Sequence, residues 1–223
     1  MNILIKFPSR GRLDKFKFSL NRYIEKKSNN HNISFICSFD KDDEEMNSAE
    51  AKEYLEQHKN YLQYFYGDHN NKIEAINSDM SDDLIFDILI LAADDLYPLR
   101  DSYDERIVSD MKLYHPDMDG CLHYMNPSWE ERLDIGCVMT KLYYSRFNYI
   151  YHPSYKSIYC DNEYMNVSKI LNKHKYIDSQ IFEHNYVVSD PTASRNWPFN
   201  GADEANYRHR ESLNFLIGKN DIN

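Results

Sequence analysis

The stretch DILILAADDLYP, Asp87–Pro98, decides the expected fold. Its apolar run, mostly isoleucine and leucine, stops at two adjacent carboxylates, Asp94 and Asp95, and then turns at a proline. An apolar run of this length that ends in turn residues is typical of a buried strand. Two neighbouring carboxylates raise each other's pKa and lower stability unless a positive charge lies beside them. The sequence therefore predicts a buried strand whose end is held by a cation.

Strand and helix patterns alternate around this stretch. Strand-like runs cover residues 2–7, 33–39, 62–67 and 86–93, and helix patterns cover residues 12–27, 42–58, 71–80 and 103–114. In the first helix pattern Leu13, Phe16 and Leu20 recur in steps of three and four, as in an amphipathic helix. Such alternation is typical of an α/β protein with a mostly parallel sheet and helices on both faces.

The pattern changes after residue 115. Residues 120–126 and 134–140 favour strands, and residues 141–149 and 160–174 favour helices, so we expect a small antiparallel portion here. Residues 184–207 are rich in Pro, Gly, Asn and Asp and predict a loop-rich tail, with a closing helix near residues 207–218. We find no internal repeat and no linker, and therefore expect a single domain over residues 1–223.

The composition is that of a globular, acidic protein. The chain is 42% hydrophobic and 28% charged, with a formal net charge of −10. This charge argues against a broad basic surface that grips nucleic acid through its phosphates. The four cysteines are widely spaced without a CxxC pair, which favours buried free thiols in a reducing compartment. We find no signal peptide and no run of about 18 apolar residues, and therefore expect a cytoplasmic protein without a membrane span.

Polar residues follow each of the first four strand patterns. These segments are residues 8–12 (PSRGR), 40–43 (DKDD), 67–72 (GDHNNK) and 93–95 (ADD). Ligands of parallel sheets bind at the carboxyl ends of the strands, so we expect the four segments to meet at one edge. Mg²⁺ and Mn²⁺ prefer carboxylate oxygens, and Mg²⁺ is typically held by one or two carboxylates together with substrate phosphates. The aspartate pair therefore predicts a metal site that binds a diphosphate.

The order of these motifs resembles a known family. ILIKFPSRGR, SFDKDD, NNKIEAIN, ILILAADDLYP, CDNEYMNV and IFEHN together are similar to glycosyltransferases of the GT-A fold, in particular the small family-2-like enzymes of bacteria and bacteriophages that use nucleotide-diphospho-sugars. The resemblance covers residues 1–186. It implies a Rossmann-like sheet with a nucleotide-sugar-binding half (1–115), an acceptor and catalytic half (116–186), and a C-terminal lid or tail (187–223).

The resemblance also implies the donor and metal ligands. The donor-binding residues would be Pro8, Ser9, Arg10, Arg12, Asp40, Lys72, Asn77 and Asp94. Either arginine suits a bidentate pair with a phosphate, and Asp40 would accept a hydrogen bond from the base, commonly uracil. The family's acidic motif is usually Asp-x-Asp, but Ala93 stands at its first position, so Asp95 is the better-supported ligand for Mn²⁺ or Mg²⁺. Asp94 would share the metal or meet the ribose, and His184 would complete the metal shell.

The catalytic carboxylate is expected at the start of the helix pattern 160–174. An inverting transferase needs a base that removes the acceptor hydroxyl proton, and the resemblance assigns this role to Asp161 or Glu163. Both residues also suit a local role as helix N-cap and capping-box partner. Lys72 could likewise be a solvated helix lysine, and the arginines could cap a surface loop. In the tail, Arg195 and Trp197 are candidates to face the substrate as part of a lid.

The sequence is therefore interpreted as a metal-dependent glycosyltransferase with a UDP-sugar donor. The acceptor hydroxyl would belong to a hydroxylated or hydroxymethylated pyrimidine in phage DNA or to a cell-surface glycan. A sugar nucleotidyltransferase is an alternative, although its first loop is normally rich in glycine and PSRGR has a single glycine. A non-catalytic module that binds sugar nucleotides is a second alternative, supported by the degenerate motif at Ala93.

Overall fold

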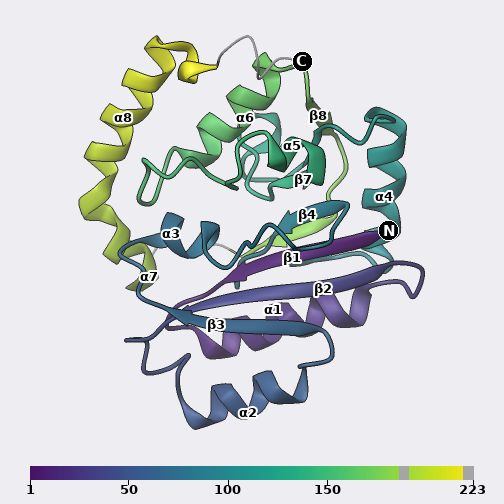
Figure 1. The fold of residues 1–223 in the computed structure, drawn as a ribbon, viewed down its shortest axis with the longest axis vertical. Helices are drawn as coiled ribbons and strands as arrows, with labels where there is room; N and C mark the ends of the chain where they lie inside the picture. The colour runs from purple at the N-terminus through teal and green to yellow at the C-terminus, as the bar shows by residue number, and fades with distance from the viewer. Residues whose placement is uncertain (186–190, 218–223) are drawn as a thin grey trace.

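A seven-stranded sheet forms the centre of the computed structural model, which describes residues 1–185 and 191–217 (Figure 1). Its strand order is β3-β2-β1-β4-β7-β6-β8. The strands are β1 (Asn2–Pro8), β2 (Asn32–Asp40), β3 (Leu62–Gly67), β4 (Ile88–Leu91), β6 (Cys121–Tyr124), β7 (Val138–Thr140) and β8 (His174–Ile177). β1 to β4 are parallel, β7 is antiparallel to both of its neighbours, and β8 is parallel to β6. The predicted mostly parallel α/β sheet is confirmed.

Helices cover both faces of this sheet (Figure 1). One face packs against α1 (Leu13–Lys26), α2 (Ala49–Gln57) and α4 (Tyr103–Tyr114), and the other against α3 (Lys72–Asn77), α5 (Lys141–Ser145), α6 (Cys160–Ile170) and α8 (Asn200–Ser212). Along β1, Ile3 and Ile5 face the first layer and Leu4 faces the second, as the two-residue period of a strand requires. No helix in the described ranges is long and apolar enough to cross a membrane.

A separate two-stranded antiparallel sheet joins distant parts of the chain. β5 (Leu96–Pro98) follows the aspartate pair directly, and β9 (Phe182–His184) lies almost ninety positions later in the sequence. Leu96 pairs with His184 in this sheet, and the Asn185 N–H donates a 2.8 Å hydrogen bond to the Asp95 carbonyl. The pairing therefore places His184 beside the carboxyl end of β4. Together with β7, this small sheet accounts for the expected antiparallel portion.

The second helix is shorter than the sequence predicts. It begins at Ala49, after the N-cap Ser48, and not at Asp42. The preceding residues form turns because the Asp43 carboxylate accepts backbone N–H bonds from Gly11 at 2.7 Å and from Met46 at 3.2 Å. A side chain that bonds to the backbone in this way competes with helical hydrogen bonding. The acidic residues of this segment thus tie the β2 end to the β1 loop.

The C-terminal segment differs from the loop-rich tail that we expected. Its described part contains α7 (Pro191–Asn196), a 3₁₀ turn (Trp197–Phe199) and α8, whereas residues 186–190 and 218–223 of the proposed tail lie outside the described residues. The Asp203 carboxylate on α8 accepts backbone N–H bonds from Lys156, Ser157 and Ile158 at 2.7–3.0 Å. These long-range contacts stabilise the first half of α8, residues 200–206, where the Asn- and Gly-containing sequence predicts a loop. Its end, at residues 207–212, overlaps the expected closing helix.

A buried ion pair fastens α8 to α6. Arg210 donates two hydrogen bonds of 2.7 Å to the Glu163 carboxylate, and the Tyr155 hydroxyl donates a third at 2.6 Å. The Glu163 side chain is 4% exposed and the Arg210 side chain 10%. A bidentate pair of this kind is geometrically specific, and loss of one partner leaves an uncompensated buried charge. Glu163 therefore holds the C-terminal helix against the second helical layer.

We expect Arg210→Met to lower the free energy of unfolding by about 3–5 kcal/mol, because the Glu163 carboxylate stays buried without its partner. Urea unfolding followed by circular dichroism measures the change. Arg208→Met on the same helix is the matched control. Its side chain is 65% exposed and contacts Glu204 and Glu211 at 3.7 and 3.8 Å, so its loss should cost less than about 1 kcal/mol. Equal effects of the two substitutions would contradict this role for the buried pair.

Candidate functional site

A cleft of about 1150 Å³ opens at the carboxyl ends of the parallel strands. Residues from all four polar strand ends line it: Pro8, Ser9, Arg10 and Arg12 after β1, Asp40 and Asp42 after β2, His69 to Lys72 after β3, and Ala93 and Asp95 after β4. The prediction that these segments meet at one edge is confirmed. The volume exceeds that of a typical drug-sized pocket, so the cleft can hold a large polar ligand together with a second molecule.

The opposite wall of the cleft comes from the second half of the chain. It contains the loop between β6 and β7, through Trp129, Arg132, Leu133 and Ile135, and the residues around the start of α6, Ser157 to Asn162. The C-terminal segment adds Arg195, Asn196, Trp197, Phe199 and Asn200. Arg195 and Trp197, expected as lid residues, therefore lie at this wall. Any ligand in the cleft would contact both halves of the chain.

Arg10 is held by carboxylates of the second strand end. Its guanidinium hydrogen-bonds to Asp40 and, through two nitrogens, to Asp42 at 2.6 and 2.9 Å. The Asp42 carboxylate raises the pKa of Arg10 and Arg10 lowers the pKa of Asp42, so both groups stay charged. Asp40 also contacts Nδ1 of His69 at 2.6 Å. A phosphate that binds Arg10 would therefore compete with these two carboxylates.

Arg12 supplies the positive charge that the aspartate pair requires. Its Nη2 lies 2.6 Å from Asp94 Oδ1 and its Nη1 lies 3.7 Å from Asp95 Oδ2. The Ser9 hydroxyl donates a 2.7 Å hydrogen bond to the other oxygen of Asp94. Burial raises the pKa of Asp94 to about 6, and Arg12 opposes this shift. Asp94 is 3% exposed and is absent from the described cleft lining, so it positions Arg12 and Ser9 from below.

Asp95 and His184 are the residues that fit a metal ion at the cleft. The distance from Asp95 Oδ1 to His184 Nε2 is 3.9 Å, and both residues line the cleft. Two ligands with bonds of about 2.1 Å to one ion lie at most about 4.2 Å apart, so the pair can share an ion. Burial lowers the pKa of His184, which favours the neutral ligand form, although Asp95 opposes this effect. Two protein ligands suffice when substrate phosphates supply others.

The structure separates the two predicted catalytic carboxylates. Asp161 lies in the first turn of α6 and lines the cleft, whereas Glu163 faces Arg210 in the buried pair and is absent from the described lining. Tyr159, with φ 63°, is the N-cap residue of α6, so Asp161 does not serve as the N-cap. Burial raises the pKa of Asp161, and the positive charge of Lys72 lowers it. Of the two predicted catalytic carboxylates, Asp161 is the one that lines the cleft and has a raised pKa.

Lys72 and Asn77 also have different surroundings, although both belong to α3. Lys72 is exposed and lines the cleft. The Asn77 amide instead accepts hydrogen bonds from the Ile150 and Tyr151 N–H groups at 2.9 and 3.2 Å, and donates to the Tyr151 carbonyl at 2.7 Å. Its polar atoms are therefore engaged with backbone, and it anchors the segment that leads to α6.

Sequence reasoning missed three kinds of cleft residue. His69 lies in the GDHNNK segment, and its ring nitrogen contacts Asp40 at the end of the neighbouring strand. No local sequence pattern predicts this contact. Trp129 and Arg132 lie in a connection that carries only turn signals. Asn162 follows Asp161 in the α6 start and also lines the cleft. In each case the neighbour that gives the residue its place is distant in the sequence.

No protein-family model matches the sequence, and a search of curated proteins finds no match. Solved structures do match. A mannosyltransferase from Pyrobaculum calidifontis in complex with GDP-Man and Mn²⁺ has a TM-score of 0.61 and 8% identity over 80% of this chain and 54% of that one. The 1–349 fragment of S. aureus TarS in complex with UDP has a TM-score of 0.56 and 9% identity over 82% of this chain and 59% of that one.

A third match comes from another class of enzyme. The 4-diphosphocytidyl-2C-methyl-D-erythritol synthase of Anaerococcus prevotii has a TM-score of 0.55 and 11% identity over 86% of this chain and 92% of that one. The expected GT-A, Rossmann-like fold is confirmed. The chain spans about half the length of the mannosyltransferase that it matches. At these identities the likeness establishes the fold, and the activity has to be argued from the site.

Lys72 and Asn77 on α3 provide a test of their different roles, cleft lining for Lys72 and backbone anchoring for Asn77. We expect Asn77→Ala to lower the free energy of unfolding by about 1–3 kcal/mol, because backbone groups of residues 150 and 151 lose their partner. Lys72→Ala, on the exposed side of the same helix, should change it by less than about 0.5 kcal/mol. Urea unfolding of both variants measures the difference. A stable Asn77→Ala variant would instead point to a direct role of Asn77 in ligand binding.

Proposed function

We propose that this chain is a metal-dependent glycosyltransferase that moves a sugar from a nucleotide-diphospho-sugar, with a UDP-sugar as first candidate, to an acceptor hydroxyl. The observation that carries the proposal is the meeting of Asp95, His184 and Asp161 in one cleft at the carboxyl ends of the parallel strands. The first two can hold a cation, and the third is a carboxylate that can accept a proton. The structural matches that contain GDP-Man with Mn²⁺ or UDP support this choice of ligand.

The donor nucleotide would bind along the β1 and β2 ends. Pro8, Ser9 and Asp40 form this part of the lining, and Asp40 would accept a hydrogen bond from the base. Arg10 would leave Asp42 for a phosphate, since Asp42 is exposed and can be solvated by water when the pair opens. Arg12 stays beside Asp94 and directs its positive charge to the end of β4. Lys72 would meet the sugar or diphosphate from the other side.

The transfer itself would use Asp161. Asp95 and His184 would hold Mn²⁺ or Mg²⁺, which would supply Lewis-acid stabilisation of the diphosphate leaving group. Asp161 takes the proton from the acceptor hydroxyl as its oxygen attacks the anomeric carbon, and the bond from that carbon to the diphosphate oxygen breaks. A direct displacement of this kind inverts the anomeric centre. Trp129 and Arg132, on the loop wall, would orient the acceptor.

A sugar nucleotidyltransferase is the second candidate. Its support is the structural match to the erythritol synthase, with a TM-score of 0.55 over 86% of this chain. The first loop speaks against it. A loop that wraps a triphosphate needs several glycines for close backbone approach, and here Gly11, with φ +62°, is the single glycine between residues 8 and 12. A non-catalytic binding module stays a third possibility that the turnover test below addresses.

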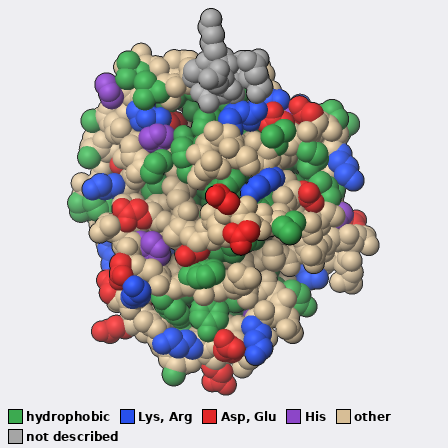
Figure 2. Space-filling model, viewed as in Figure 1, with side chains coloured by type: hydrophobic (Ala, Val, Ile, Leu, Met, Phe, Trp, Pro, Cys, Tyr) green, Lys and Arg blue, Asp and Glu red, His purple; other side chains and the backbone are tan. Residues whose placement is uncertain are grey.

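The acceptor is proposed by chemistry alone. A modified pyrimidine in phage DNA and a surface glycan both offer a hydroxyl group. The net charge of −10 disfavours a long DNA duplex, and Figure 2 shows acidic and basic side chains intermixed on one face without a broad basic patch. We therefore rank the glycan acceptor ahead of DNA. Cytoplasmic localisation stays a prediction of the sequence.

Metal-dependent binding of UDP tests the donor site. We expect isothermal titration to detect UDP binding with Mn²⁺ and at least tenfold weaker binding with EDTA, because the diphosphate loses its bridging cation. Asp95→Asn should weaken binding in the presence of Mn²⁺ to a similar degree. Asp101→Asn is the control, since Asp101 is exposed, pairs with Lys26 and lies away from the cleft. Binding of UDP that ignores both metal and Asp95 would remove the basis of the proposed donor site.

Turnover and its pH dependence test the base. Wild-type protein with Mn²⁺, a panel of UDP- and GDP-sugars and glycan acceptors should release nucleoside diphosphate, and Asp161→Asn should lower kcat by roughly 10²–10⁴-fold. Release of pyrophosphate from a nucleoside triphosphate and a sugar phosphate would indicate the nucleotidyltransferase instead. If neither product forms, the binding module is favoured.

The acidic limb of the kcat/KM profile should lie above the ordinary range of an aspartate, because burial raises the pKa of Asp161 and the base acts deprotonated. Lys72→Met removes a charge that lowers this pKa. The limb should therefore move to higher pH in the variant. A limb that stays in place or moves to lower pH would exclude Asp161 as the titrating base.

A further inference from the structure

A second cluster of metal-ligating side chains lies outside the cleft. It consists of His123 on β6, His174 on β8 and Asp134 in the connection between β6 and β7. One ligand atom from each residue lies within 4.8 Å of the other two. None of the three belongs to the described lining of the cleft, and the function proposed above uses none of them. Their convergence has no local sequence motif, since the three positions are 11 and 40 residues apart.

The sheet brings the two histidines together. β6 and β8 are parallel neighbours in which Cys121 pairs with His174, so His123 is the diagonal neighbour of His174 on the same face. The ring centroids of the two histidines are 5.4 Å apart, with an angle of 66° between the rings. β8 is the edge strand of the sheet and has β6 as its neighbour. The histidine pair therefore lies at the border of the fold.

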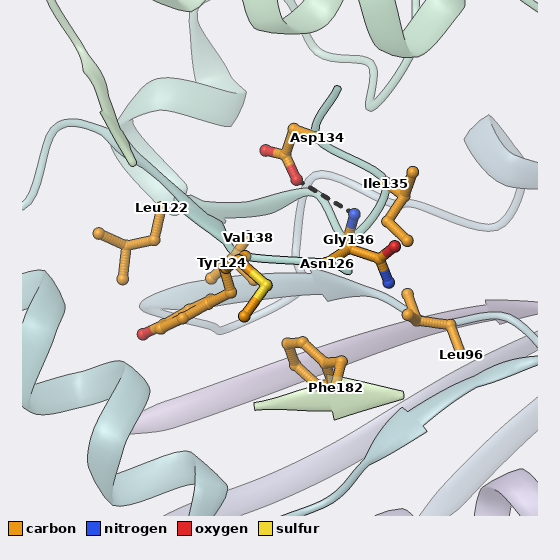
Figure 3. A pocket seen from close by; sticks show the side chains of 10 residues that line it. Leu96, Leu122, Tyr124, Asn126, Asp134, Ile135, Gly136, Val138 and Phe182 are labelled. Carbon is orange, nitrogen blue, oxygen red and sulfur yellow. Dashed lines mark hydrogen bonds between the residues drawn. The ribbon is translucent and has the colours of Figure 1, made fainter. Parts of the chain in front are cut away.

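Asp134 reaches the pair from the connecting loop. Its Oδ1 accepts a 3.1 Å hydrogen bond from the Gly136 N–H, which fixes the carboxylate above the strands (Figure 3). Figure 3 also shows the side chains of Leu122 and Val138 near this loop, beside a small internal cavity of about 10 Å³. Asp134 is 1% exposed. One carboxylate oxygen of Asp134 is thus bound to the loop backbone, and the other has no hydrogen bond among the described residues.

Several ligand atoms of this cluster are buried without a hydrogen bond among the described residues. They are Oδ2 of Asp134, both ring nitrogens of His123 and Nε2 of His174. The backbone of Glu130 and Leu133 lies near the His123 ring but outside good hydrogen-bond geometry. Buried polar groups normally have hydrogen-bond partners, so four buried ligand atoms without one indicate a missing ligand such as a metal ion.

We propose that His123, Asp134 and His174 form a second metal site that binds Zn²⁺ with an open fourth position for water. Two imidazoles and one carboxylate are a typical zinc ligand set, whereas Mg²⁺ and Mn²⁺ prefer oxygen ligands. In a tetrahedral site with zinc bonds of about 2.0–2.2 Å the ligand atoms lie roughly 3.3–3.6 Å apart. The three atoms here all lie within 4.8 Å of one another. The site differs in chemistry from the proposed Asp95–His184 site, which relies on substrate phosphates.

Zinc at this position would fix one wall of the cleft. The loop that carries Asp134 also carries Trp129, Arg132, Leu133 and Ile135, all of which line the cleft. The metal would join this loop to β6 and to the edge strand β8. It would therefore hold the wall that we assign to the acceptor, and would act by positioning and not in the transfer step. This consequence rests on the proposed function, whereas the metal site itself does not.

Direct titration of metal tests the site. The protein is first stripped with a chelator, and an Asp95→Asn/His184→Gln variant removes the cleft ligands. We expect this variant to bind one Zn²⁺ per chain and to give the visible absorption of tetrahedral or five-coordinate Co²⁺ with nitrogen and oxygen ligands. Zn²⁺ should also raise its unfolding temperature. Because this measurement leaves the cluster intact, misfolding of a cluster variant cannot decide its outcome.

Substitutions within the cluster locate the metal. In the same background, Asp134→Asn and His174→Gln should each weaken Zn²⁺ binding at least tenfold and abolish the Co²⁺ spectrum. His209→Gln, an exposed histidine on α8, is the matched control and should change neither. Absence of a bound Zn²⁺ per chain in the background variant, or equal binding in Asp134→Asn, would overturn the proposal. Wild-type protein that binds zinc but does not bind UDP in the presence of Mn²⁺ would overturn the donor site alone, so the two failures are distinguishable.

Discussion

The interaction on which the site depends is the one between Arg12 and the two carboxylates at the end of β4. Asp94 is buried under the cleft and would be unstable there as an isolated charge. Arg12 compensates it at 2.6 Å and reaches Asp95 at 3.7 Å, while Ser9 holds the far oxygen of Asp94. This arrangement ties the β1 loop to the β4 end. It also directs Asp95, the less buried carboxylate, to the ligand.

A similar arrangement of ion pairs lies at the neighbouring strand end, where Arg10 pairs with Asp40 and Asp42. Both arginines of the first loop are thus neutralised by carboxylates before any ligand arrives. A diphosphate entering such a cleft meets competition from fixed negative charges, because like charges repel at short range. A divalent cation removes this difficulty by neutralising the phosphates. The pairing of both loop arginines with carboxylates is therefore compatible with the proposed function, in which the diphosphate binds together with a metal ion.

The second half of the cleft is organised from the C-terminus. Asp203 on α8 binds three consecutive N–H groups of residues 156–158, and Arg210 holds Glu163 on α6. These two contacts flank Asp161 on both sides in the sequence. The position of Asp161 is thus set by a helix more than forty residues away. Contacts of this kind hold the proposed base in place from both sides, in addition to the 2.9 Å hydrogen bond that its Oδ1 accepts from the Asn162 N–H.

The strand-end side of the cleft depends on local sequence patterns and the other side depends on distant contacts. This difference explains what could be predicted from the sequence. The strands and the polar segments at their ends depend on local patterns, and the apolar run before Asp94 predicts that Asp95 follows a buried strand. The metal-binding role of Asp95 comes from the family resemblance and stays a proposal. Glu163 could not be separated from Asp161, because two residues at a helix start differ in orientation only relative to neighbours that the sequence does not reveal. The helical tail was missed for the same reason: Asp203 and Arg210 stabilise α8 through partners that lie in another element.

The histidine cluster extends this argument to the loop wall. His123 and His174 meet through strand pairing, and Asp134 meets them through the path of a loop, so no spacing rule could have found them. The two candidate metal sites differ in what completes them. At the proposed Asp95–His184 site two side chains fill only two coordination positions of the ion. The ion should therefore bind weakly until the diphosphate of the substrate fills others. The three ligands of the cluster, two of them buried, need no substrate, and their ion should stay bound through turnover. Donor binding would then be conditional on metal, while the acceptor wall would be permanent.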